Sequence, residues 1–292
     1  GNLAFHLHHM GKFSKKTGQY FASCISLGLQ ALHTCGYVYR DLKPENILMD
    51  VHGHIKLSDL GLACKVTPDL SGAAGTCGYW APEVLQKYDD DNNRVCYDQS
   101  ADWFSFGVII YEFVCGIGPF YTDEAISFGL NRLSPLKSKK PTKSDKKQAM
   151  NHAVLLWEPT FESHNFDEET IDLCSKLLDK NRKTRLGAQG WHEVMAHPWF
   201  EGINWPLLMV NMVKPPYKPP PGVNAQSQHV IGTFDKCENK KLENTSTDAY
   251  NFKWAWTNPE SFQTEVVQFL QYENKVGNVL LPEKPSCCCS VS

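Results

Sequence analysis

YRDLKPENIL, at residues 39–48, places a carboxylate, an ammonium group and an amide at fixed offsets in a single expected loop. These groups belong to Asp41, Lys43 and Asn46. A carboxylate that orients and deprotonates a hydroxyl has to lie close to, but apart from, the metal ligands that hold the phosphates of a nucleotide. The spacing therefore predicts phosphoryl-transfer chemistry, with Asp41 as the catalytic base.

Two further motifs follow this stretch at suitable distances. Asp59-Leu60-Gly61 begins thirteen residues past Asn46, and Ala81-Pro82-Glu83 lies downstream. Asn46 and Asp59 offer oxygen ligands of the kind that magnesium prefers, and Lys43 can neutralise charge on a migrating phosphoryl group. Taken alone, each residue would be interpreted as a solvated loop residue. Their order and spacing favour one site built from two loops.

Hydrophobic patterning predicts a mainly α chain with short β-hairpins, an α+β fold. Ser14 and Asp167 are expected to cap helices because each precedes a run with helical spacing of apolar residues. The hairpin is expected to deliver Asp59 to the site. The expected elements are helices over 14–36, 102–115 and 167–178, and a hairpin of 47–49 with 55–57.

Three other segments carry their own signals. The run from 136 to 148 holds six lysines against one aspartate and predicts a disordered loop. The prolines of 215–221 predict an extended segment over a surface, because proline cannot continue a helix or a central strand. A last helix is expected over 260–272, with its apolar residues on one face.

Composition is typical of an intracellular globular protein with one large core or two modest ones. The 292 residues are 42% hydrophobic and 21% charged, with a net charge of -3, so no global basic field favours nucleic acid as a partner. Eleven cysteines lack the spacing of a metal site or a disulfide framework, which favours reduced thiols. No apolar run reaches the roughly 18 residues of a membrane span, since Glu112 and glycines interrupt 106–120.

With these motifs, the sequence resembles the C-terminal half of a G-protein-coupled receptor kinase, a branch of the AGC serine/threonine kinases. The resemblance is carried by the catalytic motifs and by Tyr39, Leu60, 75–79 (GTCGY), 197–200 (HPWF), 215–219 (PPYKP), 223–225 (VNA) and 231–235 (IGTFD). It implies a kinase large lobe over 1–200, an AGC-type extension over 201–272 and a flexible tail over 273–292. The small lobe is expected to be absent.

The resemblance also implies roles for individual residues. ATP and Mg²⁺ are the expected cofactors, and Lys43 implies serine or threonine as the acceptor. The residues expected to contact the nucleotide are Asn2, Glu45, Leu48 and Asp59, with Leu48 under the adenine and Asn2 near the ribose. The expected structural supports are Arg40, Glu83, Asp102 and Arg185, with Glu83 paired to Arg185 and Asp102 holding the catalytic-loop backbone. The segment 241–252 is interpreted either as a tether across the nucleotide cleft or as a surface loop.

Some kinase parts are missing from the 292 residues. A glycine-rich loop, a strand lysine and its partner glutamate do not occur, and Gly1-Asn2-Leu3 resembles the segment just after the interlobe hinge. The isolated chain is therefore expected to be inactive and its longer parent active. Activation is expected through lobe closure on an activated receptor rather than through phosphorylation of Thr67 or Ser71.

The cysteines Cys287, Cys288 and Cys289 resemble a prenylation box with two palmitate acceptors beside it. They predict a cytoplasmic protein held peripherally at the plasma membrane, where the lysines of 137–147 could add attraction to anionic lipid. An unmodified tail and a solvated loop are the alternatives. For the chain as a whole, the alternatives are another AGC kinase or a noncatalytic, pseudokinase-like interaction fragment.

Overall fold

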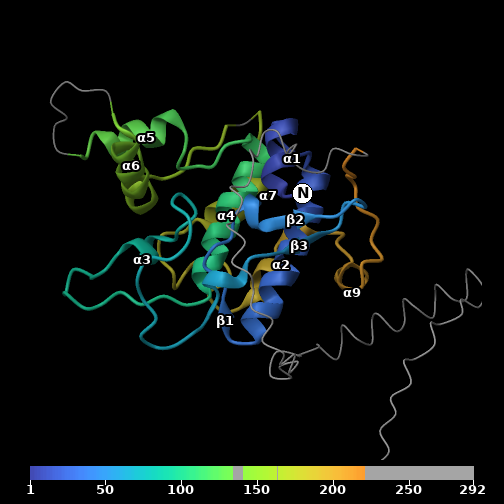
Figure 1. Cartoon of the computed structure of the whole chain (residues 1–292), viewed down its shortest axis with the longest axis horizontal. Helices are drawn as coiled ribbons and strands as arrows, with labels where there is room; N and C mark the ends of the chain where they lie inside the picture. Colours follow the sequence, from blue (N-terminus) through green and yellow to red (C-terminus); the bar gives the residue numbers. More distant parts are fainter. Residues whose placement is uncertain (134–140, 163, 221–292) are drawn as a thin grey trace, which may run out of the picture. The chain divides into compact units, whose positions relative to one another are not determined.

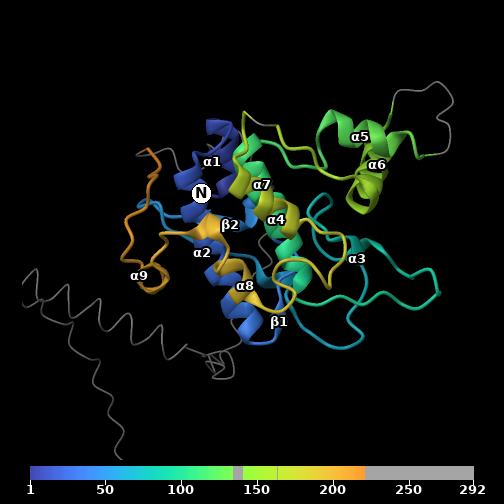
Figure 2. The ribbon, with the colours of Figure 1, turned by 180° about the vertical axis from the view of Figure 1, so that it is seen from behind.

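The computed structural model describes residues 1–133, 141–162 and 164–220 (Figures 1 and 2). Contacts separate a first unit, Gly1–Gly232, from a second, Thr233–Ser292, which lies outside the described residues. The helices of the first unit are α1 (Leu3–Met10), α2 (Lys15–Thr34), α3 (Pro82–Leu85), α4 (Ser100–Cys115), α5 (Asp123–Leu130), α6 (Lys143–Leu156), α7 (Glu168–Leu177), α8 (Trp191–Met195) and α9 (Trp205–Met209). The strands are β1 (Tyr37–Val38), β2 (Ile47–Met49), β3 (Ile55–Leu57) and β4 (Cys64–Lys65). The mainly helical fold with short hairpins is confirmed.

Two long helices form the core on which the rest is built. Ser14 caps α2, as predicted, by accepting a hydrogen bond from the Thr17 amide. α4 is almost wholly buried and packs against α2 and α7 (Figures 1 and 2). Gly107 allows the closest of these approaches, since a Cβ there would lie 2.7 Å from the Leu177 Cβ. The C-terminal end of α2 and the N-terminal end of α4 therefore support the loops that carry the polar motifs.

Two antiparallel strand pairs fix the loops that carry the polar motifs. β2 pairs with β3 in the hairpin that the sequence predicts, with Ile47 opposite Leu57. β1 pairs with β4, which the sequence analysis did not anticipate, and joins Val38 to Cys64. Because β1 precedes residues 39–48 and β4 follows Asp59, this second pairing holds the two polar loops beside each other.

The expected disordered loop over 136–148 is wrong for its described second half. α6 begins at Lys143, and Thr142 with Asp145 forms a capping box in which each side chain accepts the other's backbone N–H, at 3.2 and 2.7 Å. This reciprocal cap satisfies two otherwise unpaired donors. The helix also packs on α5. The lysines of α6 lie on the exposed face of a helix, which explains why a lysine-rich stretch here does not form a loop.

The chain after α9 lies against α1 and the β2–β3 turn, and the extended conformation expected for its prolines stays a prediction. Residues 213–220 contain neither helix nor strand, and the Tyr217 hydroxyl lies 3.2 Å from Nδ1 of His6 on α1. Gly53, in the turn between β2 and β3, meets the same segment: a Cβ there would lie 2.1 Å from the Tyr217 carbonyl oxygen. The expected helix over 260–272 and the tether over 241–252 lie outside the described residues. None of the described helices is long and apolar enough to span a membrane.

Gly53→Ala should destabilise the fold more than Gly11→Ala. Both glycines have positive φ, +93° and +74°, so both variants carry the left-handed penalty of about 1–2 kcal/mol. Only the Gly53 variant also collides with the Tyr217 carbonyl, which should add about 1–3 kcal/mol. Denaturant unfolding of both variants would measure the difference, and equal losses would show that the segment around Tyr217 does not pack on the hairpin in solution.

Candidate active site

A buried carboxylate positions the loop that carries Asp41. Asp102, fully buried on α4, accepts the backbone N–H groups of Tyr39 and Arg40, each at 2.8 Å. His33 on α2 lies 2.8 Å from the same carboxylate through its Nε2. Arg40 has φ +70°, a left-handed conformation that costs energy in a non-glycine residue. The two charge-assisted bonds to Asp102 hold the chain in this conformation just before Asp41.

The polar residues of the first motif converge on the Asp41 carboxylate. Lys43 Nζ donates to Asp41 Oδ2 at 2.8 Å, and the Asn46 amide nitrogen donates to Oδ2 and to the Asp41 carbonyl, each at 2.9 Å. Thr76 Oγ1 donates to Oδ1 at 2.7 Å and accepts from Lys43 Nζ at 2.7 Å. Asp41 is buried, and hydrogen bonds to both of its carboxylate oxygens fix its orientation. Thr76, from the segment before α3, thus joins the loop directly.

Asp59 is brought next to this loop through backbone contacts. The N–H and hydroxyl of Ser58 both donate to the Asn46 carbonyl at 2.9 Å, and the Tyr39 hydroxyl donates to the Ser58 carbonyl. Asp59 itself is exposed, has φ +55°, and accepts the Gly61 N–H through Oδ1 at 3.2 Å. The two predicted loops therefore meet at Asn46 and Ser58.

The side chains of Asn46 and Asp59 suit a magnesium ion. Both hydrogen bonds from the Asn46 amide nitrogen go to Asp41, which leaves its Oδ1 as the atom that could coordinate an ion. Asp59 contributes a hard carboxylate oxygen that is open to solvent. Magnesium commonly takes one or two protein ligands and completes its shell with phosphate oxygens and water. This fits the described residues, in which no group of three or more His, Cys, Asp or Glu side chains could hold a metal alone.

Two of the residues expected around the nucleotide, Asn2 and Leu48, lie together at β2. Gly1 and Met49 exchange backbone hydrogen bonds of 2.7 and 3.1 Å, and Asn2 forms a bridge with Leu48. The Leu48 side chain is 47% exposed. Asn2 Oδ1 accepts the Phe5 N–H at 2.9 Å and so caps α1. The sequence analysis missed this cap, although an asparagine before an apolar run is a recognised start signal.

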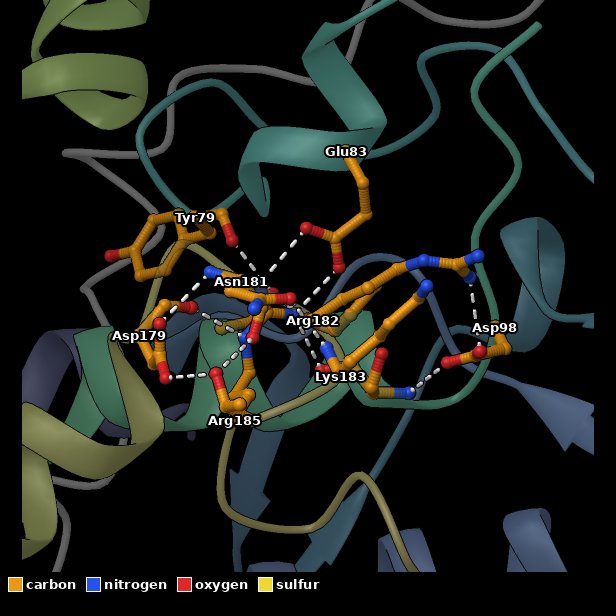
Figure 3. A network of polar contacts seen from close by, with 12 residues as sticks. Tyr79, Glu83, Asp98, Asp179, Asn181, Arg182, Lys183 and Arg185 are labelled. Carbon is orange, nitrogen blue, oxygen red and sulfur yellow. Dashed lines mark hydrogen bonds and ion pairs between the residues drawn. The ribbon is translucent and has the colours of Figure 1, made fainter. Parts of the chain in front are cut away.

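A buried ion pair fixes the far end of the segment that follows Asp59. Arg185 donates two parallel hydrogen bonds to Glu83 on α3, at 2.6 and 2.9 Å, with side-chain exposures of 0% and 5% (Figure 3). The same guanidinium donates to the carbonyls of Ser100 and Asp179 at 3.0 and 2.9 Å. A pair buried in this way holds geometry rather than adding much net stability. It ties α3 to the start of α4 and to the turn before Arg185.

Glu112 is a site neighbour that the sequence analysis noted only as a break in an apolar run. On α4 it accepts the Tyr79 hydroxyl at 2.8 Å. Burial raises the pKa of Glu112 to about 7, the Tyr79 hydroxyl opposes this rise, and the charge of Glu45 adds to it. Burial also raises the pKa of Tyr79. The signal in the sequence was a single charged residue within the apolar second half of α4, residues 106–115.

Comparison with known proteins agrees with this geometry. Residues 1–200 match the protein kinase domain, and the chain belongs to the protein kinase family. It is 33% identical over 302 residues to G protein-coupled receptor kinase 2 of Drosophila melanogaster, covering 97% of this chain and 38% of the relative. It is 36% identical over 273 residues to human beta-adrenergic receptor kinase 1, covering 92% and 36%. The resemblance to receptor kinases is confirmed, and the chain spans little more than a third of these relatives.

Glu112→Gln should remove a pH dependence of stability. The folded-state pKa, about 7, lies above the ordinary value of 4.5, so the folded chain holds this proton more tightly than the unfolded chain does. Stability from this group is then complete at acidic pH and declines as the pH rises through the window between those values. We expect the free energy of unfolding of Glu112→Gln, relative to the unaltered chain, to increase by on the order of 1–3 kcal/mol across that window.

Chemical denaturation at a series of pH values would measure this difference. Tyr79→Phe serves as the second variant, because losing the hydroxyl should move the midpoint of the pH dependence upward. A difference between Glu112→Gln and the unaltered chain that does not vary with pH would contradict the expectation.

Proposed function

We propose that this chain is the large lobe and tail of a serine/threonine protein kinase of receptor-kinase type. In the longer protein it would transfer the γ-phosphate of ATP to activated G-protein-coupled receptors. The observation that carries the proposal is the Asp41 carboxylate, held by Lys43, Asn46 and Thr76. The relatives are receptor kinases by name, which supports the choice of receptors as substrates.

The residues suit general-base catalysis on a hydroxyl. Asp41 would accept the proton of the attacking serine or threonine, and its fixed oxygens would orient that hydroxyl. Lys43, 2.8 Å from Asp41 through Nζ, would place positive charge where the phosphoryl group moves. Asn46 and Asp59 would hold magnesium, which neutralises phosphate charge when bound. Leu48 would lie against the adenine.

The isolated 292 residues are proposed to be inactive. The glycine-rich loop and the lysine–glutamate pair that a kinase uses to enclose the phosphates are not found in the sequence. A fusion that supplies them is therefore needed to test the chemistry. The part of human beta-adrenergic receptor kinase 1 that precedes its matched region, joined before Gly1, is a suitable donor.

The fusion should phosphorylate an agonist-bound receptor, and Asp41→Asn in the same fusion should reduce kcat by a factor of about 10²–10⁴, the usual contribution of a general base. ATP binding should change little, because Asp41 is not placed on the nucleotide. Asp90→Asn, at an exposed loop position, is the matched control. Radiolabel transfer and nucleotide titration would measure both quantities. A folded fusion that binds ATP and phosphorylates neither receptor nor peptide would refute the proposal.

We also propose that the protein works at the cytoplasmic face of the plasma membrane through lipid on Cys287, Cys288 and Cys289. These cysteines lie outside the described residues, so the proposal rests on their sequence. A single lipid chain gives only marginal binding, with an association constant on the order of 10⁴ M⁻¹, so prenyl and palmitoyl groups together would be required for stable anchoring.

Cys289→Ser should remove a prenyl mass and lower the bound fraction in vesicle sedimentation by at least about tenfold. Intact-mass measurement of the protein from eukaryotic cells would report the modification. Cys237→Ser, in the same part of the sequence, is the control and should leave both readouts unchanged. Identical mass and partitioning in the unaltered and Cys289→Ser proteins would exclude lipidation at this position.

A further inference from the structure

Tyr97, just before α4, contacts three parts of the site from a buried position. Its side chain is 2% exposed. The hydroxyl donates to the Gly72 carbonyl at 3.0 Å and accepts from Arg40 Nη1 at 3.3 Å. The Tyr97 N–H donates to the Leu70 carbonyl at 2.9 Å. One residue therefore links the loop that carries Asp41 to the segment between Asp59 and Glu83, which we call the activation segment.

Arg40 occupies the place from which a kinase can bind a phosphorylated activation segment. In the described residues its guanidinium forms no ion pair with an acidic side chain. Instead Nε donates to the Leu62 carbonyl at 2.6 Å and Nη1 donates to the Tyr97 hydroxyl. Arginine has five N–H donors, and two of them are satisfied by neutral oxygens at this position. Two uncharged oxygen acceptors thus occupy positions around the Arg40 guanidinium where the negative charge of a phosphate would otherwise be expected.

The hydroxyls of the activation segment leave few places for such a phosphate. The Thr76 hydroxyl forms hydrogen bonds with Asp41 and Lys43. The buried Tyr79 donates its hydroxyl to Glu112. Thr67 and Ser71 remain. Tyr97 binds the carbonyls of the residues on both sides of Ser71, so the backbone around this serine is already held.

The activation segment also lies directly against the catalytic loop. A Cβ at Gly75, where φ is +104°, would lie 2.2 Å from the Arg40 carbonyl oxygen. The backbones can approach this closely only if the segment between Gly72 and Gly75 is kept in position. The Tyr97 contacts lie at the start of that stretch, and Thr76 holds its end.

We infer that Tyr97 is a positioning residue that holds the activation segment against Arg40 without a phosphate on Thr67 or Ser71. Its hydroxyl supplies an acceptor to the arginine and a donor to the segment, and so bridges the two as a phosphate would. The effect on rate rests on the proposed kinase function. The ordering of the activation segment does not rest on that function. It can be measured by hydrogen exchange on the 292 residues alone.

Tyr97→Phe removes the hydroxyl and keeps both the ring and the N–H bond to Leu70. Losing a buried bond of this kind should speed hydrogen exchange of the amides of residues 67–76 by about tenfold or more. Tyr111→Phe is the matched control: it removes a hydroxyl that donates to the Thr160 carbonyl at 2.8 Å from a side chain 4% exposed. The control should leave exchange in 67–76 unchanged. Exchange measured by mass spectrometry on both variants would give the comparison.

Phosphatase treatment of the unaltered chain provides a second arm that needs no variant. Exchange in 67–76 should be the same before and after treatment, and a rise would overturn the inference. Equal exchange in Tyr97→Phe and the unaltered chain would overturn it as well. In the active fusion, Tyr97→Phe should lower kcat by about fivefold or more and leave KM for ATP within about twofold, since the nucleotide residues are elsewhere. An inactive fusion with the expected exchange pattern would refute only the proposed function.

Discussion

The buried carboxylate of Asp102 is the constraint on which the site depends. Arg40 has a left-handed backbone conformation and Asp41, directly after it, is held in one orientation. This backbone conformation is energetically unfavourable for a residue other than glycine, and it persists only where surrounding contacts fix it. Asp102 accepts two consecutive backbone N–H groups from Tyr39 and Arg40 and is itself held by His33. The apolar helix α4 delivers this charge into the core, so the geometry of Asp41 is set by packing far from any substrate.

The activation segment is then fastened at separate points along its length. β4 pairs it with β1 at its start, Tyr97 holds its middle, Thr76 binds Asp41, and the Glu83–Arg185 pair secures its end. These contacts use different chemistry: a strand ladder, hydrogen bonds of the Tyr97 and Thr76 hydroxyls, and a desolvated ion pair. Because each acts on a different stretch, the loss of one would loosen the segment locally while the fold remains intact.

Much of this architecture could be predicted from the sequence, for identifiable reasons. Helix caps such as Ser14 and the β2–β3 hairpin are local signals, and the catalytic spacing of residues 41–59 is carried by one short stretch. The resemblance supplied two long-range contacts, Glu83 with Arg185 and Asp102 with the catalytic loop, but contacts that no motif carries were not accessible in the same way. The β1–β4 pairing involves two residues a side, and Tyr97 and Glu112 are single residues whose partners lie far along the chain. The sequence does not predict α6, because the high lysine content of 136–148 obscures the capping box of Thr142 and Asp145.

The contact between Tyr217 and the β2–β3 turn has a practical consequence for how the protein is divided. The kinase match ends at residue 200, which makes that residue a tempting place to stop a recombinant chain. Stopping there would remove the contacts that Tyr217 makes with Gly53, with the ring of Phe21 and with His6. A recombinant piece that keeps these contacts therefore has to include Tyr217, seventeen residues beyond the end of the kinase-domain match.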